Sequence, residues 1–158
     1  MWKWLKKWFA KDKSQQLVVL NSANVEKVLM KWKAELGIEH QSETTNFPID
    51  EIKGNYSITG SNPGSSKNSY FGQLAIQPHG ELVKGTWQIG YDNQQQKGLG
   101  FIHKNLLAMD FYYTDDAQRF YGQVIYEMKN EELTGYWVER NVEGIGREQA
   151  SWLNGLIG

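Results

Sequence analysis

The chain has 158 residues, enough for one domain with short accessory segments and a core that needs no cross-links. It has no cysteine, which excludes disulfides, cysteine-ligated metals and a cysteine nucleophile. The formal net charge is −1, but residues 1–13 carry five Lys and one Asp, a local charge of +4 that leaves −5 for the remainder. Most of the chain therefore has no electrostatic reason to bind nucleic acid, and we expect none as a partner.

Residues 1–13 divide into an aromatic side and a basic side when they are placed on a helix. The aromatic arc spans about 160° at 100° per residue and contains Met1, Trp2, Trp4, Leu5, Trp8 and Phe9. The other side contains Lys3, Lys6, Lys7, Lys11 and Lys13. This division is typical of a helix that lies in a bilayer interface, with Trp at the headgroup level and lysines beside anionic phosphates. The alternatives are a groove on a partner protein and the chain's own barrel.

The same segment does not have the pattern of an export signal. Its apolar residues are interrupted by lysines, and no small-residue cleavage pattern follows. It is also too short to span a bilayer, which needs about 20 apolar residues. We therefore expect a cytoplasmic protein, peripheral at the inner face of a membrane, whose residues 1–13 contact an anionic membrane surface or a protein groove.

A second amphipathic helix is predicted from about Ala23 to Leu36, within a connecting region of residues 14–51. Ser22 or Asn24 can cap its start, and Gly37 can end it. Its apolar face collects Val25, Val28, Leu29, Trp32 and Leu36. We expect this helix to pack on the following domain as a structural lid. Residues 38–51 are polar and acidic and are predicted to be a linker or long loop.

Residues 52–158 are predicted to form a β-barrel domain. Alternating polarity divides them into about eight strands separated by short turn sequences. The predicted strands are 52–60, 68–77, 82–91, 97–103, 105–113, 118–128, 132–140 and 145–153. Short connections make neighbours antiparallel, and eight such strands without a crossover helix close most simply into an up-and-down barrel. A two-sheet sandwich is the alternative. The fold class is therefore mainly β, with two amphipathic helices before the barrel.

The alternation also predicts which side chains face the interior. The apolar parity places aromatic rings inside and carries Glu139 inward with Trp137. Glu148 also points inward if the last strand keeps its register from Trp152 through Ala150. The resulting candidate cavity residues are Tyr70, Trp87, Tyr91, Tyr126, Trp137, Glu139 and Glu148. The alternative is that both carboxylates lie at the barrel mouth, solvated or paired with an arginine, because an unpaired buried charge is costly. In the strand 97–103 the parity is ambiguous.

No motif in the sequence indicates catalysis, a metal site or a cofactor. The three histidines lie in different segments and form no metal-ligand pair, and no nucleophile elbow or phosphate loop is present. His40 and His79 are expected to be exposed. We therefore predict a protein that is not an enzyme and has no catalytic residue, no metal and no cofactor.

In several segments a glycine lies two residues before, or close to, an aromatic residue. They are Gly54-Asn55-Tyr56-Ser57-Ile58, Tyr70-Phe71-Gly72-Gln73-Leu74, Gly85-Thr86-Trp87-Gln88-Ile89, Gly122-Gln123-Val124-Ile125-Tyr126 and Leu133-Thr134-Gly135-Tyr136-Trp137. With these segments the region 54–153 resembles calycin-type barrels, the lipocalin and avidin group, and most closely small bacterial barrel domains with the same Gly-x-Trp repeat. The resemblance implies a barrel that binds small apolar molecules. The Gly-x-Trp of lipocalins lies near the first strand, where this chain has Gly54-Asn55-Tyr56, and no avidin ligand set can be matched.

Two hypotheses of function follow. The first is a non-enzymatic binding or adaptor module that an N-terminal amphipathic helix attaches to a membrane surface. The alternative is a lipocalin-like carrier of a small apolar or aromatic ligand, or a subunit of a larger assembly docked through the same helix. A small barrel whose interior is filled by large side chains would disfavour the carrier.

Overall fold

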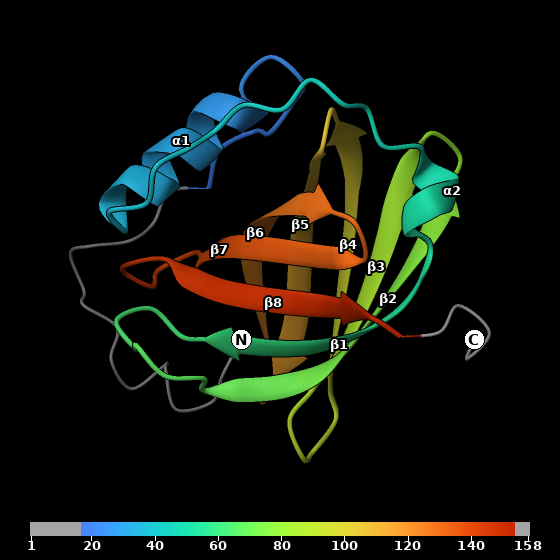
Figure 1. The fold of residues 1–158 in the computed structure, drawn as a ribbon. Helices are drawn as coiled ribbons and strands as arrows, with labels where there is room; N and C mark the ends of the chain where they lie inside the picture. The colour runs from blue at the N-terminus through green and yellow to red at the C-terminus, as the bar shows by residue number, and fades with distance from the viewer. Residues whose placement is uncertain (1–16, 154–158) are drawn as a thin grey trace.

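The computed structural model describes residues 17–153, so the predictions made for residues 1–13 lie outside the described part. The chain forms a closed barrel of eight antiparallel strands in sequence order, with β1 also pairing with β8 (Figure 1). The strands are β1 Gly54–Ser61, β2 Tyr70–His79, β3 Leu82–Ile89, β4 Gln94–His103, β5 Leu106–Asp115, β6 Gln118–Lys129, β7 Glu132–Glu139 and β8 Gly146–Trp152. The predicted fold class is confirmed, and the sandwich alternative is wrong.

The hairpins form where the sequence places turn residues. Asp116 and Ala117, between β5 and β6, both have positive φ, at 50° and 64°. Two consecutive positive φ values are typical of the type I′ turn, whose twist matches that of antiparallel strands. Lys104 and Asn130 start the β4–β5 and β6–β7 turns, each with φ of 56°. These tight connections keep every strand beside its neighbour in sequence.

The period-2 pattern resolves the strand with ambiguous parity. In β4, Gln96 and Gly98 are buried, whereas Lys97 and Leu99 are exposed. The barrel interior therefore takes its residues from the parity of Gln96, and the β4 strand begins three residues earlier than predicted. The interior is one continuous apolar cluster that includes Ile58, Leu74, Val83, Trp87, Met109, Phe111, Tyr126 and Trp137.

Helix α1, Val25–Glu35, packs on the outside of the barrel wall (Figure 1). Its buried Val25, Leu29 and Trp32 belong to a second apolar cluster. The barrel supplies to this cluster side chains that point outward from the strands: Leu106, Ala108, Ile125, Tyr136 and Val138. Gly37 ends the helix with φ of 71°, as predicted. The expected packing of this helix on the barrel is confirmed, although it covers the wall and not the mouth.

A short helix, α2, Ile49–Ile52, lies in the segment predicted as a linker. Ile52 is buried, and Phe47 and Ile49 pack against the barrel core. The Tyr56 hydroxyl donates to the Ile52 carbonyl oxygen at 2.7 Å, which ties the helix to β1. Segment 47–52 therefore covers the end of the barrel where β1 starts, here called the closed end. Among residues 17–153, no helix is long and apolar enough to cross a membrane.

Candidate functional site

The barrel interior contains six of the seven predicted cavity residues. Trp87, Trp137 and Tyr126 are fully buried, and Tyr70 is 6% exposed. Glu139 and Glu148 are buried as well, at 0% and 3% exposure, so the alternative of solvated carboxylates at the mouth is wrong. All of these side chains except Tyr126 come from the strand halves farthest from α2. We call this end of the barrel the polar end.

Tyr91 was predicted to face the interior, and that prediction is wrong. Its side chain is 94% exposed. β3 ends at Ile89, and Gly90 has φ of 75°, a conformation that takes the chain out of the strand and breaks the alternation. The Tyr91 ring instead packs edge-on against Phe71 on the outer surface, with ring centroids 4.9 Å apart.

Glu148 is the centre of a buried polar cluster. The Tyr70 hydroxyl donates to Glu148 Oε1 at 2.7 Å, and the Tyr126 hydroxyl donates to Glu148 Oε2. Trp87 Nε1 donates in turn to the Tyr126 oxygen at 3.1 Å. Both carboxylate oxygens therefore have a phenol donor, which compensates part of the cost of removing the carboxylate from water.

Two glycines make this cluster possible. Gly60 of β1 lies directly between Glu148 and Tyr70, and Gly135 of β7 lies between Glu148 and Tyr126. Each tyrosine reaches across its glycine to the carboxylate. A Cβ at Gly60 would clash with the Tyr70 ring, and one at Gly135 would come within 2.6 Å of Tyr126 Cε1. These two glycines thus leave the space that the rings occupy, as expected for glycines inside a barrel.

Burial sets the protonation behaviour of the cluster. Burial raises the pKa of the Glu148 carboxyl above its usual value, and the hydrogen bonds from Tyr126 and Tyr70 oppose this shift. Burial, and then the negative charge of Glu148, raise the pKa of both Tyr70 and Tyr126 well above the usual value. The two phenols therefore stay protonated and remain hydrogen-bond donors at neutral pH.

The second buried carboxyl, Glu139, accepts a hydrogen bond from the Tyr113 hydroxyl. Tyr113 comes from β5 and stacks on Phe120 of β6, with ring centroids 5.2 Å apart. Sequence reasoning did not select Tyr113, although it continues the inward parity of Phe111. The alternation along β5 is therefore the sequence signal that identifies Tyr113 as an interior residue.

Two further polar side chains are buried at the polar end. Asn62 follows β1 and is 2% exposed, and neither polar atom of its amide has a hydrogen-bond partner. Gln96 is fully buried; its Nε2 donates to Gln94 Oε1 at 3.1 Å, but its own Oε1 has no partner. A buried polar atom without a partner costs about 1–3 kcal/mol. A water molecule or a ligand's polar group would remove that cost. Both residues fall in stretches predicted as turns.

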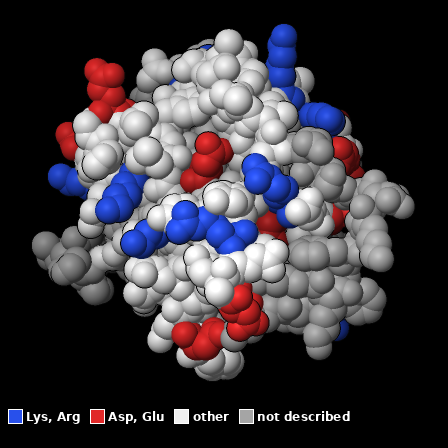
Figure 2. Space-filling model, turned by 180° about the vertical axis from the view of Figure 1, so that it is seen from behind, with Lys and Arg blue, Asp and Glu red and all other residues white. Residues whose placement is uncertain are grey.

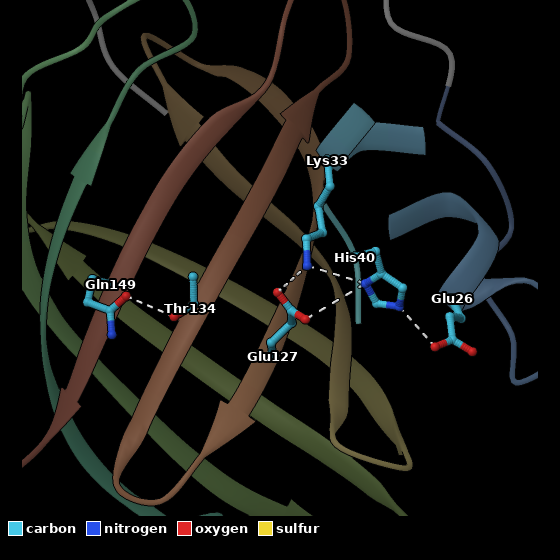
Figure 3. A network of polar contacts seen from close by, with 6 residues as sticks. All are labelled: Glu26, Lys33, His40, Glu127, Thr134 and Gln149. Atoms are coloured by element: carbon cyan, nitrogen blue, oxygen red, sulfur yellow. Dashed lines mark hydrogen bonds and ion pairs between the residues drawn. The ribbon is translucent and has the colours of Figure 1, made fainter. Parts of the chain in front are cut away.

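A separate polar network joins α1 to the outer wall of the barrel (Figure 3). Lys33 Nζ donates to Glu127 Oε1 at 3.0 Å and lies 3.3 Å from His40 Nδ1. The other ring nitrogen of His40 is 2.9 Å from Glu26 Oε2. The His40 side chain is only 6% exposed, so the prediction of an exposed histidine is wrong, whereas His79 is exposed as predicted. This network fixes the chain that follows α1 against β6.

Two of the clefts on the described residues open at the surface. One of about 610 Å³ lies at the closed end and is lined by α2, by Tyr56 and by Trp152. Another of about 430 Å³ lies between segment 39–47 and the end of β6. Within residues 17–153, no group of three or more acidic or histidine side chains is placed to hold a metal ion.

Comparisons with known proteins add little to this geometry. No family model matches the chain, and no curated protein matches it. Among solved structures, the chain is similar to one described as a "REP1-NXSQ fatty acid transporter". The two share 10% identity over 66% of this chain and 98% of that one, with a TM-score of 0.42. Likeness at this level carries no argument about function, so the functional conclusion depends on the residues themselves.

Proposed function

We propose that the protein is a non-catalytic β-barrel binding module, held at the cytoplasmic face of a membrane by its N-terminal segment. The observation that carries the proposal is the division of residues 1–13 into Trp and Phe on one side and lysines on the other. The barrel supports it in a second way. Glu148 is hydrogen-bonded by Tyr70 and Tyr126, and the interior is filled by large rings, so the outer surface is left for recognition.

Vesicle co-sedimentation of the full chain tests the attachment. We expect binding to vesicles that contain anionic phospholipid, weaker binding to neutral vesicles, and a loss of binding as salt is raised, because lysines near an anionic surface are screened. The double substitution Trp4→Glu and Trp8→Glu should release the protein from the vesicles. A matched control is Trp152→Glu, which changes an exposed Trp at the closed end of the barrel.

Two outcomes would contradict the proposal. Equal sedimentation of the Trp4→Glu/Trp8→Glu variant and the unchanged chain would show that residues 1–13 are not the attachment. Absence of vesicle binding by both would point to a protein groove as the partner of this segment, as in a subunit of a larger assembly. A pull-down with residues 1–13 as bait would then identify that partner.

The second candidate function is a carrier of a small apolar or aromatic ligand, and one observation favours it. Asn62 and Gln96 place polar atoms without partners at the polar end of the interior, where a ligand's polar group would satisfy them. Against it, Trp87 and Trp137 fill the interior, so a ligand would have to displace a ring.

Tryptophan fluorescence distinguishes the carrier from a solid barrel. A ligand inside the barrel is expected to quench the emission of Trp87 and Trp137, and Trp137→Phe should reduce the quenching while keeping a ring in place. The matched control is Trp152→Phe, at an exposed position outside the core. Quenching that survives Trp137→Phe and disappears with Trp152→Phe would place the ligand outside the barrel and exclude the carrier.

A further inference from the structure

Basic and aromatic side chains form one row across the outer wall of the barrel. Lys97 of β4 pairs with Tyr112 of β5, Tyr112 pairs with Tyr121 of β6, and the Arg140 N–H donates to the Tyr121 carbonyl oxygen. All four side chains are exposed. Figure 2 shows the face that lies behind in Figure 1, where basic side chains gather in a row with acidic ones above and below.

Arg119 and Lys84 add two cations beside this row. The Arg119 guanidinium lies over the Tyr112 ring at 4.7 Å, just as the guanidinium of Arg140 lies over the Tyr121 ring at 5.1 Å. Lys84 of β3 is in the neighbouring row, paired with Leu99. Acidic residues border the row: Asp110 on one side and the β5–β6 turn on the other. We call the set Lys84, Lys97, Tyr112, Arg119, Tyr121 and Arg140 the basic–aromatic face.

Exposed aliphatic side chains lie beside the basic–aromatic face. Val19 is 84% exposed and Leu99 is 44% exposed. Leu20, Leu82 and Leu99 line a shallow hollow of about 130 Å³ on the outer wall. Apolar side chains next to cations and tyrosines match the composition of a membrane interface, where the apolar groups enter the headgroup region and the cations meet phosphates.

The described chain also begins at this face. Gln123, two residues after Tyr121 on β6, holds the backbone of Val18 from both sides. The Val18 N–H donates to Gln123 Oε1 at 3.3 Å, and Gln123 Nε2 donates to the Val18 carbonyl oxygen. The same Nε2 is 2.8 Å from Asp110 Oδ1, which fixes the amide. The described chain therefore starts at the edge of the basic–aromatic face.

We propose that the basic–aromatic face is a second membrane contact, lying against anionic phospholipid headgroups on the side where the described chain begins. This inference rests on the proposed membrane attachment and adds a docking orientation for the barrel. Residues 1–13 carry a charge of +4 and would be repelled by a cationic face, so this segment is not its occupant. Nucleic acid would use the cations but not the exposed valine and leucine, and the barrel region is acidic overall.

The test compares two triple variants of the full chain that change the net charge equally. The first is Lys97→Glu, Arg119→Glu and Arg140→Glu, on the basic–aromatic face. The matched control reverses three exposed lysines elsewhere: Lys53→Glu, Lys67→Glu and Lys129→Glu. Partitioning onto vesicles with 30% phosphatidylserine should weaken about tenfold or more for the first variant. The control should weaken severalfold less. Thermal unfolding of both variants verifies that the fold is kept.

Each outcome decides between the alternatives. Equal partitioning of the two variants, while Trp4→Glu/Trp8→Glu abolishes binding, would overturn the second contact and leave the attachment intact. Failure of the unchanged chain to bind vesicles would overturn both proposals. A first variant that keeps vesicle binding but loses binding to a single-stranded RNA oligonucleotide would show that the face serves nucleic acid and would also overturn the inference.

Discussion

The two sides of the barrel wall are built from the same strands and follow different rules. Inside, several large rings lie against a neighbouring glycine, and the buried carboxyl of Glu148 has phenol donors for both oxygens. Outside, one part of the wall is apolar and covered by α1, and another part carries exposed cations and tyrosines. The interior is therefore determined by strand register, whereas the exterior depends on what lies against it.

The largest expected effect removes a ring from the interior. Trp137→Ala should lower the free energy of unfolding by about 3–5 kcal/mol, because it leaves a cavity in a packed core. Tyr121→Ala, on the outer wall, should lower it by about 1 kcal/mol or less, since it removes mainly an exposed contact with Arg140. Chemical denaturation measures both. Similar losses in the two variants would mean that the interior and exterior rings do not differ in this way.

The next prediction concerns the glycines that let the rings cross. Gly60→Ala should destabilise the protein by about 1–3 kcal/mol, because the added Cβ would clash with the Tyr70 ring that reaches Glu148. The matched test is Gly60→Ala in a Tyr70→Leu background, where the ring is gone. We expect the alanine to be much less harmful there, which a double-mutant cycle measures. An unchanged penalty would assign the loss to the backbone and not to the ring.

The sequence predicts the interior well because a strand alternates strictly. Parity alone places Trp137 and Glu139 inside together, and it identifies the segments with a glycine near an aromatic residue as places where rings fill the barrel. The errors lie where the alternation stops. Tyr91 follows the positive-φ Gly90 and leaves the strand, and Gln96 lies in a polar run that has the composition of a turn but continues β4.

The exterior is less predictable because its burial depends on other segments. Ile125 and Tyr136 point outward and are still buried, since α1 covers them. The sequence around His40 has the composition of a solvated linker, yet tertiary contacts with Lys33 and Glu26 bury the His40 side chain. The row of Lys97, Tyr112 and Tyr121 depends on register between strands, which a single sequence does not give. The candidate site inside the barrel could thus be predicted, and the outer contacts could not.

The buried carboxyl gives a test by pH. Because burial raises the pKa of Glu148 in the folded state, its contribution to stability is full below the unfolded pKa and is lost as pH rises through the folded pKa. Glu148→Gln has no such loss. The free energy of unfolding of the variant relative to the unchanged chain should therefore rise between pH 4 and pH 7, by on the order of 1 kcal/mol. The substitution can also lower stability by an amount that does not depend on pH, and this amount does not change the expected rise with pH.

Glu81→Gln, at the exposed turn between β2 and β3, is the control for the pH test and should show a flatter difference. The substitution at Glu148 should also lower the pKa of Tyr70 and Tyr126, because the charge that helps to raise it is gone. Ultraviolet titration of the phenols measures this shift. If the free energy of unfolding of Glu148→Gln relative to the unchanged chain fell from pH 4 to pH 7, this would contradict a buried site that disfavours the charged carboxylate.

The smallest effect is expected at the outer network that holds α1. Glu127→Gln should lower the global free energy of unfolding by about 1 kcal/mol, because it weakens a charged hydrogen bond to the nearly buried Lys33. Its main effect should be local. Amide hydrogen exchange is expected to accelerate in α1 and in residues 38–47, while the strands of the barrel keep their protection. Glu131→Gln, at an exposed turn, should change neither region. Equal acceleration in the strands would show that the cover and the barrel open as one cooperative unit, and the distinction between the two sides of the wall would then be geometric but not energetic.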